Sequence, residues 1–244
     1  QGTDAALALA LGHVVLREYH VDRQVPYFAD YLRRYSDLPF LVKLVERDGR
    51  LVPDRLLRAA DFADALGETN NPDWKPVAID ENSGNIVCPV GSAGFRWGEQ
   101  GKWNLEGKDG QGRDVRLRLS LADVQDAVMP VAFPYFGTVA PETFVATDHD
   151  EILERHVPVK RVTLKDGAAY VASTYDLFLA NFGLDRGFGG GHVAASYDDD
   201  VPFTPAWAER VCGVPRQAII QVAREFATNA ERTEGRSMVI LGAG

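Results

Sequence analysis

The sequence predicts an α/β fold of mixed α+β character, with helices flanking a parallel strand at the C-terminal end and a β-hairpin-rich insertion in the middle. Three observations predict this class. Apolar residues recur at helical spacing near both ends of the chain. Two-residue turn signals separate apolar stretches in the middle. Residues 237–241 form an apolar run without alternation, which is typical of a strand buried on both faces of a parallel sheet.

Two helices are expected near the N-terminus. The first begins at Thr3 or Asp4, because either side chain can accept a hydrogen bond from an otherwise unpaired backbone N–H. Its predicted apolar face consists of Leu7, Leu11, Val14 and Val15. The second begins near Pro26, a residue favoured in the first helical turn. Its apolar stripe consists of Phe28, Leu32 and Tyr35.

The middle of the chain reads as hairpins. Asp48-Gly49 predicts a tight turn within 40–52, and Asp166-Gly167 predicts another within 157–171. A polar turn separates strands expected at 76–79 and 86–90, and residues 115–121 alternate between apolar and polar, as in a strand with one buried face. Between the hairpins, a helix is expected over 54–66, ending at Gly67.

Helices and a strand are expected to follow. Thr204-Pro205 supplies an N-cap and a first helical residue, and Gly213 ends that helix. A longer helix is predicted over 214–227, with Ile219, Val222, Ala223 and Phe226 turned inward. The strand at 237–241 then leads into the turn 242–244. Since the sequence opens on a helix cap and closes on a strand and turn without the following helix, we expect it to be a segment of a longer chain.

Composition excludes several classes of protein. Asp and Glu outnumber Lys and Arg by 35 to 26. This excess argues against a protein that wraps around nucleic acid and against one that binds a membrane surface through many basic residues. Two cysteines, Cys88 and Cys212, cannot supply the four thiolates of a typical iron–sulfur cluster. Both lie in apolar surroundings and are expected to behave as small buried hydrophobes. The apolar run at 5–11 is far shorter than the roughly 20 residues of a membrane-spanning helix.

Several stretches could carry chemistry, but each has a simpler structural interpretation. The glycine-rich loop 187–191 lacks the preceding strand and the third glycine of a dinucleotide fingerprint, so a surface loop is expected. The carboxylates of 148–151 and 198–200 could bind Ca²⁺ or Mg²⁺, but they do not fit a calcium loop, and helix capping or solvation explains them. Aromatic and cationic residues at 94–103 predict a stacked hairpin that anchors itself to the protein. No nucleophile motif and no metal-ligand spacing of histidines is present in the sequence.

The first four residues can be interpreted in two ways. Backbone N–H groups at a helix N-terminus attract phosphate, and Asp4 could accept two parallel hydrogen bonds from the N1–H and N2–H of a guanine. Alternatively, Thr3 and Asp4 only cap the helix.

Several stretches, in order along nearly the whole chain, resemble the molybdenum-containing catalytic (alpha) subunit of respiratory nitrate reductases. Gln1-Gly2-Thr3-Asp4 by itself would indicate only the wider molybdopterin oxidoreductase family. The matching stretches are 1–14, 94–99, 101–106, 133–137, 196–199, 204–209 and 235–238.

The resemblance implies reduction of nitrate to nitrite with quinol-derived electrons in anaerobic respiration. It implies a bis-molybdopterin guanine dinucleotide cofactor with molybdenum and one [4Fe-4S] cluster in the parent subunit, neither of which this chain alone is expected to hold. The implied partners are an iron–sulfur beta subunit and a haem-containing membrane gamma subunit, at the cytoplasmic face of the cell membrane, with no nucleic acid. The chain alone is expected to be inactive.

The resemblance also implies roles for particular residues and regions. Gln1, Gly2, Thr3 and Asp4 correspond to the family motif that receives a guanosine end of the cofactor, and Gly242 and Gly244 to a loop close to it. No residue is expected to be catalytic or to bind the metal. The implied regions are a helical end of one cofactor-binding region (1–67), a β-rich insertion (68–172) and the start of the next cofactor-binding region (173–244). Alternatives are a sister chlorate, selenate or perchlorate reductase, or a non-catalytic interaction module.

Overall fold

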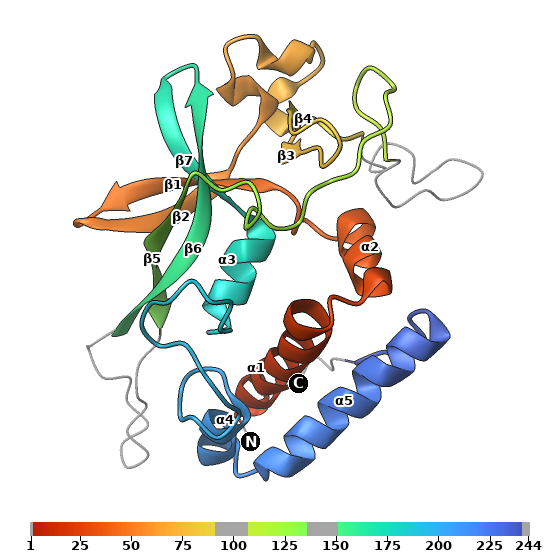
Figure 1. The fold of residues 1–244 in the computed structure, drawn as a ribbon, viewed down its shortest axis with the longest axis vertical. Helices are drawn as coiled ribbons and strands as arrows, with labels where there is room; N and C mark the ends of the chain where they lie inside the picture. Colours follow the sequence, from red (N-terminus) through yellow and green to blue (C-terminus); the bar gives the residue numbers. More distant parts are fainter. Residues whose placement is uncertain (1, 91–106, 136–150, 241–244) are drawn as a thin grey trace. The chain divides into compact units, whose positions relative to one another are not determined.

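The computed structural model describes residues 2–90, 107–135 and 151–240, and it combines helices with an antiparallel sheet (Figure 1). The mixed α and β class predicted from the sequence is confirmed. The chain divides into two compact units. A helical unit contains residues 1–31, 182–186 and 193–244, and a sheet unit contains residues 32–181 and 187–192. The regions 1–67, 68–172 and 173–244 concern the roles of the chain in a larger protein and stay a prediction.

In the helical unit, helix α1 (Asp4–Val15) continues directly into the π-helix η1 (Leu16–Asp22) and packs against α4 (Pro205–Cys212) and α5 (Arg216–Thr233) (Figure 1). Helix α2 (Pro26–Tyr35) begins at the predicted proline. Thr204 caps α4, since its hydroxyl oxygen accepts a hydrogen bond from the N–H of Trp207 at 3.2 Å. The predicted start of α4, and its end before Gly213, are therefore confirmed.

The buried faces of α1 and α5 differ from the predicted ones. In α1 the fully buried side chains include Ala6, Ala10 and Val14, whereas Leu7, Leu11 and Val15 are only half-buried. Alanine lets two helices approach closely, so the small residues take the centre of the contact and the larger ones flank it. In α5 the inward prediction is right for Ile219 and Ala223 but wrong for Val222 and Phe226, which are 52% and 37% exposed.

The parallel strand predicted at 237–241 is not confirmed. Residues 237–240 adopt no regular structure, and Met238, Val239 and Ile240 are strongly exposed. A strand requires a neighbour that takes its backbone hydrogen bonds. Among the residues that the structure describes, no strand or bridge pairs with 237–240.

The sheet unit contains a five-stranded antiparallel sheet in the order β2-β1-β7-β6-β5. Its strands are β1 (Leu41–Arg47), β2 (Arg50–Leu56), β5 (Ala127–Tyr135), β6 (Glu151–Leu164) and β7 (Gly167–Ser173). The sheet curls so that β2 and β5, the two ends of the order, contact each other. Helix α3 (Thr174–Asn181) packs on β6 and β7, and its Leu177 and Ala180 join a core with Val131, Phe133 and Val157.

The turn chemistry predicted the hairpins correctly. Asp48 and Gly49 both have positive φ, as a type I′ turn requires, and Arg47 pairs with Arg50 across the turn. Leu164 pairs with Gly167 at the second turn. The short strands β3 (Ala78–Ile79) and β4 (Ile86–Val87) form the third hairpin.

The helix predicted over 54–66 is wrong. Strand β2 extends to Leu56 because its backbone pairs with β1, and three short 3₁₀ turns follow. These are η2 (Ala59–Asp61), η3 (Ala65–Gly67) and η4 (Pro72–Trp74). The carboxylate of Asp61 accepts a hydrogen bond from the N–H of Arg58 at 2.8 Å and two from the guanidinium of Arg55. Local side-chain bonds therefore replace the helical ladder here.

Residues 115–121 bury one face as predicted, since Leu117, Leu119 and Leu121 are buried, but they form a single bridge and no strand. The buried carboxylate of Asp176 holds this segment, accepting from the Ser120 hydroxyl and the Leu121 N–H, both at 2.7 Å. No helix within the described ranges is both long and apolar enough to cross a bilayer.

Candidate functional site

The predicted cofactor motif lies at the N-terminus of α1. Gly2 has φ +81°, a conformation that strains any side chain, and an added Cβ would meet no atom within 4 Å. Thr3 occupies the N-cap position, and its carbonyl accepts from the N–H of Ala6 at 3.1 Å, but its side chain makes no capping bond. Asp4 is the first helical residue and is exposed.

The structure shows no side-chain cap at the start of α1. A capping carboxylate or hydroxyl would bond to a backbone N–H of the first turn. Within the described ranges, no hydrogen bond or ion pair to the side chains of Thr3 or Asp4 is observed. The Asp4 carboxylate therefore stands at an exposed helix end, where it can act as a hydrogen-bond acceptor.

Three residues of the predicted site cannot be placed. Gln1, Gly242 and Gly244 lie outside the described residues. The structure does not test their predicted role, which stays a prediction.

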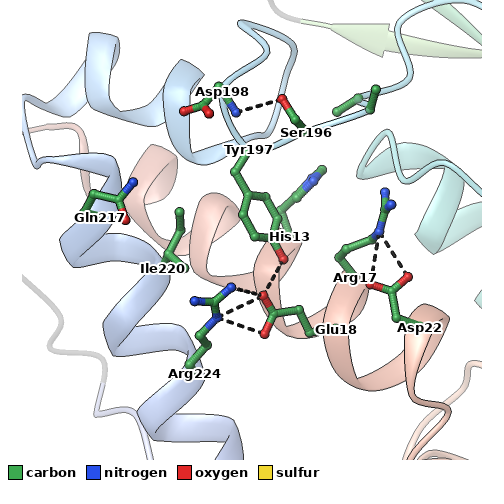
Figure 2. A pocket seen from close by; sticks show the side chains of 12 residues that line it. His13, Arg17, Glu18, Asp22, Ser196, Tyr197, Asp198, Gln217, Ile220 and Arg224 are labelled. Atoms are coloured by element: carbon green, nitrogen blue, oxygen red, sulfur yellow. Dashed lines mark hydrogen bonds and ion pairs between the residues drawn. The ribbon is translucent and has the colours of Figure 1, made fainter.

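A polar pocket of about 450 Å³ lies further along the same helix, between η1, α5 and the segment 193–198, all in the helical unit (Figure 2). Glu18 lines it, and the side chains of Arg224 and Tyr197 point toward the Glu18 carboxylate (Figure 2). Arg224 of α5 donates to both carboxylate oxygens, with distances of 2.7 and 3.0 Å to Oε1 and 3.0 Å to Oε2. The Tyr197 hydroxyl donates to Oε1 at 3.0 Å.

The electrostatics of this pocket are those of a satisfied ion pair. Burial, followed by the charge of Glu18, raises the pKa of the Tyr197 hydroxyl well above its usual range. The hydrogen bond to Glu18 raises the pKa of the Arg224 guanidinium. Both donors thus keep their protons at neutral pH.

His13 lies in the wall of the pocket and is 1% exposed. Its Nδ1 lies 2.9 Å from the carbonyl oxygen of Phe182. Because a carbonyl can only accept, Nδ1 carries the proton in this bond.

The loop 187–191 has a structural role. Strand β6 pairs with β5 over 151–159 and with β7 only over 160–164, which leaves one flank of its first half open. Gly190 forms a bridge to Arg155 on that flank, and the Phe188 carbonyl accepts from His156 Nδ1 at 2.8 Å. We call residues 187–192 the edge loop, since it covers an exposed strand edge.

The acidic run 198–200 is explained by local bonds. Asp199 accepts from the N–H groups of Ala195 and Ser196 at 2.8 and 2.9 Å. Asp198 and Asp200 form ion pairs with Arg216 and Arg210, respectively. These bonds stabilise the segment before α4, but none of the three carboxylates caps that helix, whose N-cap is Thr204.

The remaining candidates do not form a site in the described part of the chain. No group of three or more His, Cys, Asp or Glu side chains suited to a metal ion occurs there. Cys88 is buried, and burial raises the pKa of its thiol to about 11, so it is unreactive. Cys212 is free and half-buried. The hairpin predicted at 94–103 and the acidic residues 148–150 lie outside the described residues.

Sequence reasoning missed the pocket around Glu18. One signal was present in the sequence. Ala6, Ala10, Val14 and Glu18 recur every four residues, so a charged side chain continues the stripe of small apolar ones. A carboxylate at that position predicts a cationic partner on the helix packed against it.

The chain is similar over its whole length to known proteins. The chain is 56% identical to the alpha chain of respiratory nitrate reductase 1 of Escherichia coli (strain K12), and 54% identical to the alpha chain of its respiratory nitrate reductase 2. Both alignments cover 100% of this chain and 20% of the relative. The perchlorate reductase alpha subunit of Dechloromonas aromatica (strain RCB) is 26% identical, over 100% of this chain and 19% of its own length. No protein-family model matches the chain.

These similarities make the chain a homologue of oxidoreductase alpha subunits. Within that class it is homologous, from end to end, to the alpha chains of respiratory nitrate reductases, which confirms the predicted resemblance. The chain spans about a fifth of the length of these relatives.

Proposed function

We propose that the chain is the segment of a molybdenum nitrate reductase alpha subunit that contributes part of the cradle for the guanine dinucleotide cofactor. One observation carries this proposal. In a chain homologous throughout to nitrate reductase alpha chains, the Asp4 carboxylate lies exposed at a helix N-terminus, in the Gln-Gly-Thr-Asp motif.

The residues present fit a guanosine end of the cofactor. The Asp4 carboxylate would accept two parallel hydrogen bonds from the guanine N1–H and N2–H, a bidentate, charge-assisted arrangement. Gly2, with no side chain and open space around it, would let the ligand approach the backbone. Gln1, Thr3, Gly242 and Gly244 complete the proposed contact set. When bound, the cofactor supplies the molybdenum that takes an oxygen atom from nitrate.

The remaining features of the enzyme are proposed from the family. They are a bis-molybdopterin guanine dinucleotide, one [4Fe-4S] cluster, iron–sulfur beta and haem-containing gamma subunits, and a location at the cytoplasmic face of the membrane. Nitrate is the proposed substrate, and its reduction requires parts of the alpha subunit beyond these residues. None of these 244 residues is assigned a catalytic or metal-binding role.

A sister perchlorate, chlorate or selenate reductase is less well supported. Identity to the perchlorate reductase subunit is 26%, against 56% to a nitrate reductase alpha chain over the same length of this chain. A free-standing interaction module is equally disfavoured, because similarity to one enzyme subunit extends over the whole chain.

Replacement of Asp4 in the full-length enzyme tests the proposal. Asp4→Ala removes the acceptor, and we expect weaker cofactor retention, with a loss of at most about 1.5–3 kcal/mol per charge-assisted bond. Molybdenum and guanine nucleotide content of the purified protein would be measured. Asp123→Asn serves as a control, since that carboxylate is 89% exposed on the sheet unit. Unchanged occupancy and activity in Asp4→Ala would overturn the assignment.

A further inference from the structure

Helix α1 packs against α4 and α5 through a face whose central residues, Ala6, Ala10 and Val14, are small. Ala6 and Ala10 pack with Ala208 and Ile219, and Val14 packs with Ile220 and Ala223 of α5. Helices fix their relative position by fitting ridges of side chains into grooves. Alanine methyl groups make low ridges, so the centre of this contact resists sliding along the helix axis less than its flanks, where Leu7, Leu11 and Val15 pack.

Glu18, the next residue of the same four-residue series, adds a charged restraint beside the hydrogen bonds that Tyr19 and Arg23 make to α5. Its carboxylate receives hydrogen bonds from the guanidinium of Arg224 on α5 and from the hydroxyl of Tyr197, which lies on a separate segment (Figure 2). The Glu18 side chain is 22% exposed and that of Arg224 is 54% exposed, so the carboxylate side of this pair is the more buried one. A guanidinium that engages both carboxylate oxygens fixes orientation as well as distance, and the tyrosine fixes a third direction.

The N-terminal motif lies at the other end of the same continuous helical segment. At 1.5 Å per residue, Asp4 and Glu18 are about 20 Å apart along the axis. A helix transmits axial displacement along its length, so a slip at Glu18 moves Asp4 by a similar amount. A displacement of about 1 Å is enough to impair a hydrogen-bonded site strongly.

We propose that Glu18 is a positioning residue for the cofactor motif Gly2–Asp4, acting through the axial setting of α1. This inference rests on the proposed function of Asp4. Glu18 does not touch the cofactor; it determines where the bidentate acceptor stands.

The test uses the full-length enzyme and four single variants. Glu18→Gln preserves the shape but removes the charge, and Asp4→Asn removes the charge of the proposed acceptor. Glu231→Gln is the matched control, because Glu231 on α5 pairs with Arg23 at the end of η1, at 2.7 and 2.8 Å and with similar exposure, but no tyrosine hydroxyl of the described residues adds a third bond there. Val14→Ala lowers the stability of the same helix contact without touching the polar anchor. Each protein is assayed for its rate of molybdenum loss well below its unfolding temperature, and for its thermal midpoint.

We expect Glu18→Gln to accelerate molybdenum loss about 10-fold, as is typical for supporting contacts, and Glu231→Gln to leave it unchanged. In the Asp4→Asn background, adding Glu18→Gln should have no further effect, because the residue acts through Asp4.

If Val14→Ala accelerates loss as much as Glu18→Gln at the same thermal midpoint, Glu18 is merely structural and the inference fails. If Asp4→Asn accelerates molybdenum loss but Glu18→Gln does not, the inference fails and the proposed function stands. If neither variant changes retention, the proposed function itself fails.

Discussion

Gly190 allows the edge loop to pack closely against β6. Its φ of +101° lies in a region that side chains rarely adopt, and an added Cβ would stand 3.0 Å from the backbone nitrogen of His156. The positive φ angle and the short Cβ distance both reflect the close approach of the edge loop to β6. The run of glycines therefore reflects packing against a strand and not the binding of a phosphate.

We predict that Gly190→Ala loosens the edge loop. Backbone strain together with the close contact should cost about 1–3 kcal/mol. Hydrogen exchange of the β6 amides in the full-length protein, followed by mass spectrometry, would show faster exchange near Arg155. Gly112→Ala is the matched control, since Gly112 also has positive φ but no atom lies within 4 Å of its Cβ position. Equal exchange near Arg155 in wild type and Gly190→Ala would contradict the role given to this glycine.

At the residue scale, sequence reasoning succeeded where the signal was local. The placement of Thr3 and Asp4 at a helix start follows from neighbouring residues. The partners of Glu18 could not be predicted, because Tyr197 and Arg224 lie far away in the sequence and only the packing of α5 on α1 brings them together.

At the scale of elements, the small-residue contact between α1 and its neighbours is the feature most sensitive to volume. Ala10 is fully buried there, whereas Ala8 on the same helix is exposed. Any larger side chain at position 10 must push the helices apart, because protein interiors are close-packed.

We therefore predict that Ala10→Leu destabilises the helical unit by about 1–3 kcal/mol through overpacking. Ala8→Leu, with the same change of side chain and nearly the same helix propensity, should stay within about 0.5 kcal/mol of wild type. The rate of native-state proteolysis within α5 of the full-length protein would report the difference. Similar rates for the two variants would show that the contact can expand freely.

Helices and strands were predicted correctly where the local sequence signal was strong, and wrongly where it was weak. Asp48-Gly49 fixes a turn through backbone conformation alone, so its hairpin was predicted correctly. The segment 54–66 has weak helical periodicity, and pairing with β1 overrides it as far as Leu56. Residues 237–241 have the composition of a buried strand, but no described residue supplies the neighbouring strand that this composition requires.

For the whole molecule, the exposed apolar residues 238–240 are the most informative surface. Met238, Val239 and Ile240 are 78%, 66% and 81% exposed, and such clusters on soluble proteins mark sites of contact or aggregation. The chain spans a fifth of the length of its relatives, so a larger protein offers ample surface to cover them.

We predict opposite effects of replacing residues 238–240 by serine in two contexts. In the 244-residue chain alone, the change should reduce self-association, as measured by sedimentation. In the full-length enzyme, it should lower the yield of folded protein, because serine cannot replace the apolar surface buried there. Serine replacements at the exposed α5 residues Gln221, Glu225 and Arg232 provide the control. Normal yield of the full-length variant would show that the segment stays exposed.

The connectivity of the molecule has a consequence for the order of folding. Leu41 pairs with Ser173, and α1 packs on α5, so both contacts join early residues to late ones. Such distant pairings form slowly, because a long loop must close before any contact stabilises it. During synthesis, the β1–β2 hairpin can form at once, but β1 must wait for β7. Helix α1, which leaves the ribosome before the other elements described here, finds its partner α5 only after the whole sheet has been made.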